Sequence, residues 1–73
     1  MVVPEQIKVW IESGLPGSEA TVTGDGRHFE AIIVYSGFEN KSKLQQHRMV
    51  YEALGDKMHS EIHALSMKTF SQL

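Results

Sequence analysis

The segment that most constrains the fold is an amphipathic helix flanked by two strand-like runs. The helix lies within Phe38–Leu54, where Ser42 can cap the first turn and Gln45 follows at the three-residue spacing of a capping box. The strand-like runs lie on either side, at Phe29–Tyr35 and Ile62–Lys68. A strand, a helix and a second strand in this order predict a right-handed crossover with the two strands parallel in one sheet.

Apolar residues recur along the helix at three- and four-residue steps, which is typical of a helix with one buried face. They are Leu44, Met49 or Val50, Tyr51, Leu54 and Met58. We therefore expect this stripe to pack against the rest of the domain.

The remaining elements are predicted from capping and turn residues. A first helix is expected over Pro4–Ser13, with Gly14 as its left-handed stop. A short strand at Ala20–Thr23 leads into a Gly-Asp-Gly reversal at residues 24–26, and a second strand follows at His28–Tyr35. The predicted fold is α+β in the order α-β-β-α-β, with two helices over a three-stranded mixed sheet. The first strand is antiparallel to the second, and the third is parallel to it.

Length and composition predict one small domain over residues 1–73. A chain of this size buries only about 60% of its unfolded surface. No apolar run approaches the roughly 20 residues of a membrane span, and no secretory leader is visible, so we expect a cytoplasmic domain without a membrane partner. Cysteine is absent, so any soft-metal site must obtain sulfur ligands from another molecule.

Two histidines stand at the starts of the strands that are predicted to be parallel. His28 precedes one apolar run and His63 lies at the beginning of the other. Parallel strands begin at the same end of a sheet, so these side chains can approach one metal centre. The residue pattern leaves the alternative open that His28 is solvated beside the turn and that His63 is hydrogen-bonded on a half-buried strand.

Basic residues near the long helix suggest nucleic-acid binding as a second function. Lys41, Lys43 and Arg48 can contact phosphates, but the net charge is −2 and the isoelectric point is near 6.0. A GXXG motif at residues 14–17 lies between the first helix and the hairpin and contains no basic residue, so a helix stop and turn explain it.

The segment GDGRHFEAIIVYSGFENKSKLQQHRMVYEAL, followed by IHALSMKT, resembles the BolA family. The resemblance covers Thr23–Thr69 and implies the same α-β-β-α-β plan, similar to a class II KH domain. Asn40 replaces a glycine that is usual in the family, and asparagine also tolerates the left-handed conformation. Many members continue into a polar or helical tail, and we expect no role of such a tail in a chain that ends at Leu73.

The resemblance implies a non-enzymatic partner of a monothiol glutaredoxin, and the two proteins share a 2Fe–2S cluster in a heterodimer. The glutaredoxin and its glutathione supply sulfur, while this chain supplies His63, at the position of the family's principal ligand, and His28 from the hairpin loop. No catalytic residue is assigned, and we expect the isolated chain to be monomeric. The alternative is a KH-like transcriptional regulator that binds DNA or RNA through Lys41, Lys43 and Arg48.

Overall fold

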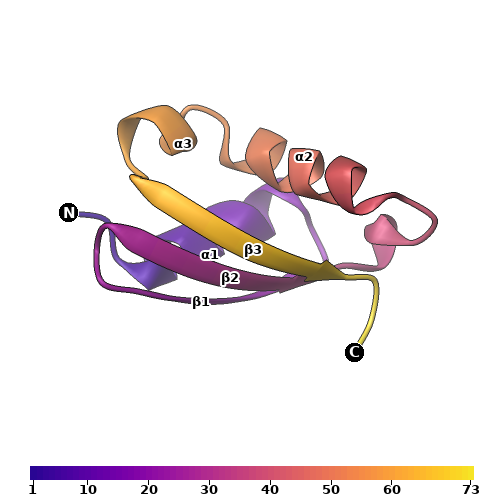
Figure 1. The fold of residues 1–73 in the computed structure, drawn as a ribbon. Helices are drawn as coiled ribbons and strands as arrows, with labels where there is room; N and C mark the ends of the chain where they lie inside the picture. The colour runs from indigo at the N-terminus through magenta and orange to yellow at the C-terminus, as the bar shows by residue number, and fades with distance from the viewer.

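The computed structural model describes all 73 residues and contains the predicted order of helices and strands (Figure 1). A 3-10 turn and a four-residue helix lie between the predicted elements and were not expected. The elements are α1 (Pro4–Gly14), β1 (Glu19–Gly24), β2 (His28–Val34), η1 (Ser36–Phe38), α2 (Lys43–Leu54), α3 (Lys57–Ser60) and β3 (Ala64–Phe70). No helix is long and apolar enough to cross a bilayer.

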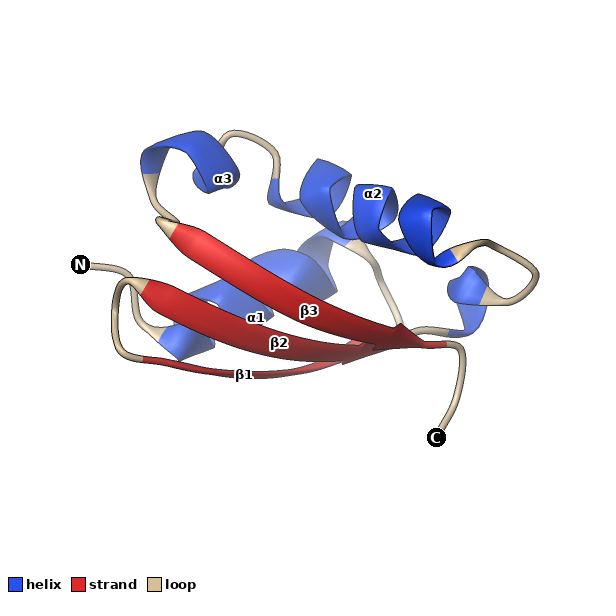
Figure 2. Cartoon of the chain, in the orientation of Figure 1, coloured by secondary structure: helices blue, strands red, loops and turns tan.

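The three strands form one mixed sheet in the order β1-β2-β3. β1 is antiparallel to β2, and β2 is parallel to β3, as the strand–helix–strand pattern predicts. Residue His28 lies opposite Ala64 at one end of the parallel pair, and Val34 lies opposite Phe70 at the other. The helices lie behind and above the sheet in Figures 1 and 2, which leaves the front face of the sheet uncovered.

The core lies between α1, α2 and the covered face of the sheet. Strand β2 alternates as predicted, with Phe29, Ala31 and Ile33 buried and the residues between them exposed. The other fully buried apolar side chains come from α1, η1 and α2, and they are Ile7, Ile11, Phe38 and Val50. The α+β prediction is therefore confirmed both in topology and in the buried face of the central strand.

Helix α2 begins at the predicted capping box. The Ser42 hydroxyl accepts from the Gln45 N–H at 3.1 Å, and the Ser42 N–H donates to Gln45 Oε1 at 2.9 Å. The predicted apolar stripe is wrong at Leu44 and Tyr51, which are 62% and 42% exposed. The buried face instead runs through every fourth residue, Gln46, Val50 and Leu54.

A buried amide replaces the expected apolar side chain in the first turns of α2. Gln46 Nε2 donates to the carbonyls of Phe38 and Lys41 at 3.2 and 2.9 Å. Its Oε1 accepts from the Thr69 hydroxyl at 2.6 Å. The side chain therefore ties the loop before α2 to strand β3, and Asn40 within that loop is left-handed, at φ 65°.

Gly14 is the last residue of α1, and the prediction that it is a left-handed stop is wrong. The glycine of this turn with positive φ is Gly17, at 93°. A Cβ atom on Gly14 would lie 2.5 Å from Ala53 Cβ, so glycine is required here because α1 and α2 approach closely.

Candidate functional site

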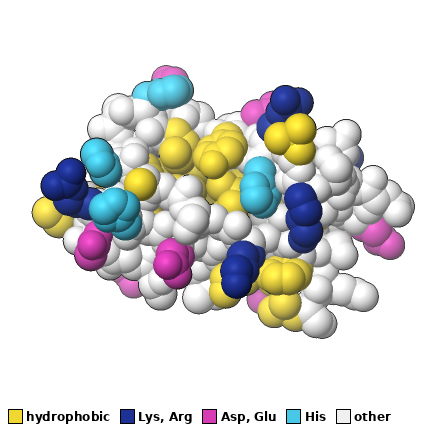
Figure 3. Space-filling view, in the orientation of Figure 1, with side chains coloured by type: hydrophobic (Ala, Val, Ile, Leu, Met, Phe, Trp, Pro, Cys, Tyr) yellow, Lys and Arg dark blue, Asp and Glu magenta, His cyan; other side chains and the backbone are white.

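The structure brings His28 and His63 together at one end of the sheet. Their ring centroids lie 6.1 Å apart with the ring planes at 86°. His28 is the first residue of β2, and His63 immediately precedes β3, so the parallel register sets them side by side. Both residues are exposed, and Figure 3 shows histidine side chains gathered where these strands begin.

The hairpin turn holds His28 through the carboxylate of Asp25. Asp25 Oδ1 accepts from the main-chain N–H groups of Arg27 and His28, each at 2.9 Å. The N–H of His28 is the main cause that lowers the pKa of the Asp25 carboxyl group, and the N–H of Arg27 adds to it. Gly26 supplies the positive φ of 99° that the turn requires. The carboxylate therefore orders the backbone that carries this imidazole.

His63 is positioned by its two neighbours along the chain. Ile62 is 4% exposed, and its N–H donates to the Lys57 carbonyl at 2.9 Å, which fixes the connection from α3. The N–H of Ala64 donates to the Arg27 carbonyl at 3.0 Å, next to His28. The two histidines are thus held by backbone contacts of one small region, and both imidazoles remain accessible to solvent.

Two accessible imidazoles can provide part of a metal coordination sphere. The chain contains no cluster of three or more His, Cys, Asp or Glu side chains that could hold a metal ion by themselves. His59 lines the same surface hollow as His63, whereas His47 lines a different one between α2 and β3. The histidine pair can therefore supply only part of a coordination sphere, and a metal centre here would need ligands from another molecule.

The three basic residues that the sequence suggested for phosphate binding do not converge. All three are exposed, and Lys41 and Arg48 line a shallow hollow that also contains the carboxylate of Glu52. Lys43 does not line this hollow and lies against β3 instead. Its ammonium donates to the Thr69 carbonyl and lies 5.1 Å from the centroid of the Phe70 ring.

Sequence reasoning missed two residues that organise this region. It assigned Asp25 only to the chain reversal. An aspartate whose carboxylate accepts from the N–H groups two and three residues later is typical of an Asx turn. It gave Gln45 a capping role but did not identify Gln46 as buried, because a glutamine within a helix has no local signal of burial.

Comparison with known proteins agrees with this architecture. The family model described as "BolA-like protein" matches residues 2–73 of this chain. A solved structure of a BolA protein homologue from Coxiella burnetii is 51% identical, with a TM-score of 0.91 over 96% of this chain and 91% of that one.

Two curated relatives are longer proteins. BolA-like protein 1 of Mus musculus is 38% identical over 89% of this chain and 45% of its own length. The DNA-binding transcriptional regulator BolA of Haemophilus influenzae is 35% identical over 66% of this chain and 47% of its own length. The chain thus spans about half of each. The match along almost its entire sequence establishes that this chain belongs to the BolA-like protein family.

Proposed function

We propose that this chain is a non-enzymatic partner of a monothiol glutaredoxin, and that the two proteins jointly ligate a 2Fe–2S cluster. The role of the pair would be assembly or transfer of the cluster, or regulation by iron or redox state. The observation that carries the proposal is the pair of accessible imidazoles, with ring centroids 6.1 Å apart, in a chain without cysteine.

The donor set fits a shared cluster. Clusters of this type are usually held by four cysteine thiolates, and histidines replace two of them in some proteins. This chain offers two imidazoles and no thiolate, so a cysteine of the glutaredoxin and the thiol of glutathione would complete the ligand set. A cluster with imidazole ligands has a higher reduction potential than an all-thiolate one.

The residues of this chain would position and tune the ligands. Asp25 orders the backbone at His28, and buried Ile62 anchors the chain next to His63, so the main chain that carries each imidazole is ordered before the partner arrives. Imidazole must be neutral to bind a metal. We therefore expect joint ligation to be sensitive to pH.

Reconstitution with a monothiol glutaredoxin, glutathione and iron tests this proposal. Visible absorption and circular dichroism should show a heterodimer spectrum that differs from that of the glutaredoxin homodimer. His63→Ala should abolish this spectrum, His28→Ala should weaken or alter it, and His59→Ala is the matched control, because that histidine is exposed on α3 near the site. A native spectrum retained by both His63→Ala and His28→Ala would refute histidine ligation.

Nucleic-acid binding is a second candidate, because a relative 35% identical to this chain is named a DNA-binding transcriptional regulator. The candidate residues remain Lys41, Lys43 and Arg48. True phosphate binding weakens steeply as salt rises. A titration of labelled DNA at low and moderate salt, with the triple alanine variant as the comparison, would eliminate this function if no binding occurs at low salt.

A further inference from the structure

The outer edge of β3 carries main-chain groups without partners inside the protein. The N–H of Ala64 donates to Arg27 and the carbonyl of Phe70 accepts from Tyr35, so the even-numbered residues of β3 bond to β2. Alternation along a parallel strand then directs the N–H and C=O groups of the odd-numbered residues, Leu65, Met67 and Thr69, to the open edge. Of these groups only the Thr69 carbonyl has a partner, the ammonium of Lys43.

A hollow of about 310 Å³ lies beside this edge, between β3 and α2. It is lined by Lys43, His47, Met67, Lys68, Thr69 and Phe70. Figure 3 shows apolar side chains exposed between β3 and the helices above it. The half-buried Leu65 and Met67 side chains pack against the core from this strand. A groove with a mainly apolar surface therefore lies beside residues 67–70 of β3, and the open main-chain groups continue from it to Leu65.

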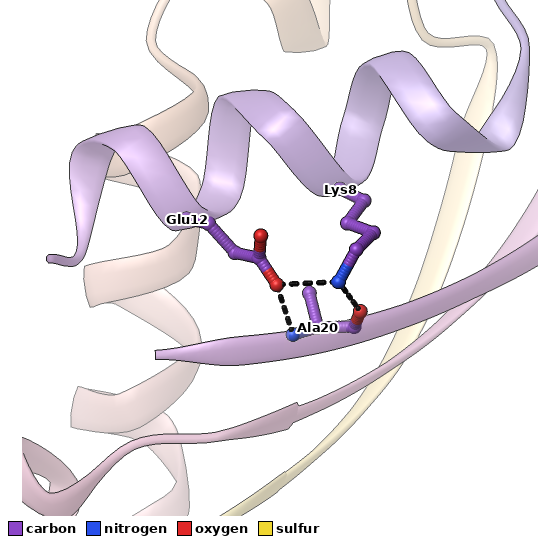
Figure 4. Close-up of polar contacts among 3 residues, drawn as sticks. All are labelled: Lys8, Glu12 and Ala20. Carbon is purple, nitrogen blue, oxygen red and sulfur yellow. Dashed lines mark hydrogen bonds and ion pairs between the residues drawn. The ribbon is translucent and has the colours of Figure 1, made fainter. Parts of the chain in front are cut away.

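The opposite edge of the sheet is partly occupied by side chains of α1. At Ala20 of β1, the N–H donates to Glu12 Oε2 at 2.9 Å, and the carbonyl accepts from Lys8 Nζ at 2.9 Å (Figure 4). Lys8 and Glu12 also form an ion pair at 2.6 Å. The Lys8 ammonium and then the Ala20 N–H lower the pKa of the Glu12 carboxyl group. Side chains of α1 thus occupy both outward main-chain groups of Ala20, which hinders strand pairing at this end of β1.

We propose that the β3 edge receives an extended acidic segment of a partner protein as a fourth strand. Main-chain groups of Leu65 and Met67 would pair with the incoming strand, and its apolar side chains would enter the groove beside α2. The charge of the groove selects an acidic segment, since Lys43 and Lys68 line it and no carboxylate does. This surface begins two residues after His63, and pairing along it does not require cluster binding.

A synthetic peptide tests this inference with the whole chain. The probe is an acetylated and amidated heptapeptide that alternates valine with threonine and carries glutamate at each end, so either strand direction brings one glutamate to the lysines. In ¹⁵N–¹H spectra, the amides of Leu65 and Met67 should move downfield and exchange more slowly with solvent. Those of Ser66 and Lys68, which already bond to β2, should change less. No saturable shift of the Leu65 and Met67 amides would overturn the proposal.

Two matched comparisons separate strand addition from simple charge attraction. Lys68→Glu should weaken peptide binding about fivefold, whereas Lys41→Glu, the same charge change outside the groove, should leave it unchanged. Two versions of the peptide, each N-methylated at one alternate set of amides, should differ in their affinity for the protein, because only one set of N–H groups can face β3. Equal binding by both methylated peptides and the parent would contradict main-chain pairing.

An oligothymidylate strand provides the last comparison. The acidic-peptide proposal expects it to bind this edge more weakly than the peptide, or not at all. If the oligonucleotide shifts the same two amides at lower concentration, with affinity falling steeply as salt rises, the groove is a nucleic-acid site and the peptide proposal is wrong.

Discussion

Gly14→Ala should destabilise this protein, although alanine is the better helix former. Gly14 ends α1 against α2, and an added Cβ would meet the Cβ, Cα and carbonyl oxygen of Ala53 at 2.5, 2.8 and 3.0 Å. Two of these three atoms belong to the backbone, so no side-chain rotation can relieve the contact. The helices would have to move apart.

The magnitude follows from two opposing effects. Alanine gains at most about 1 kcal/mol over glycine from helix propensity, while forcing extra atoms into a packed contact costs about 1–3 kcal/mol. The propensity gain is smaller than this limit at Gly14, because it is the last residue of α1 and not an interior one, so we expect a net loss of about 1–2 kcal/mol in the free energy of unfolding. For a domain of this size, each kcal/mol lowers the Tm by about 4–8 °C.

Urea denaturation followed by the fluorescence of Trp10, the only tryptophan, measures this loss. The companion variant Ala53→Gly removes the clashing Cβ, so Gly14→Ala should cost less in that background than in the native chain. Ser13→Ala, an exposed neighbour in α1, reports propensity alone and should change stability little. A Gly14→Ala protein as stable as the native one, or a double variant that shows no coupling, would refute the close-contact argument.

Three further substitutions test individual polar groups. Thr69→Val leaves Gln46 Oε1 buried without its donor and should cost about 1–3 kcal/mol, whereas Thr21→Val on the exposed sheet face should change urea stability by less than about 0.5 kcal/mol. Ser18→Ala removes a buried hydroxyl that has no partner, so thermal denaturation should show equal or higher stability, and a large loss would reveal a partner. Folding lowers the pKa of the Glu12 carboxyl group, chiefly through the Lys8 ammonium, so its stabilisation is present at neutral pH and is lost in acid, below the ordinary pKa of a glutamate. Glu12→Gln should therefore lower stability at pH 7 and flatten the acid-side decline, and an unchanged pH profile would exclude this contribution.

Local features of the sequence were sufficient to predict most of the fold. The capping box at Ser42 and Gln45, the alternation along β2 and the left-handed tolerance of Asn40 all depend on neighbouring residues, and the structure contains each of them. The parallel arrangement of β2 and β3 followed from the helix between them. That arrangement led to the expectation that His28 and His63 lie at one end of the sheet, and they do. Their role as ligands stays a prediction.

The failed predictions concern contacts between segments far apart in the chain. Periodicity identified α2 as amphipathic but did not establish which side faces the core, so Leu44 and Tyr51 were wrongly placed in the buried stripe. The role of Gly14 depends on Ala53, and that of Lys43 depends on the Thr69 carbonyl.

The order of the main helices and strands, the strand directions and the residues that can act as ligands could all be predicted from the sequence, because caps, turns and hydrophobic periods act over a few residues. Three features became visible only in the folded chain: His28 lies opposite Ala64, the three basic residues diverge, and side chains of α1 occupy the outward main-chain groups of Ala20. Strand register and helix approach are set by packing across the whole core. That packing brings together residues that are far apart along the chain, and no pattern among neighbouring residues reveals such contacts.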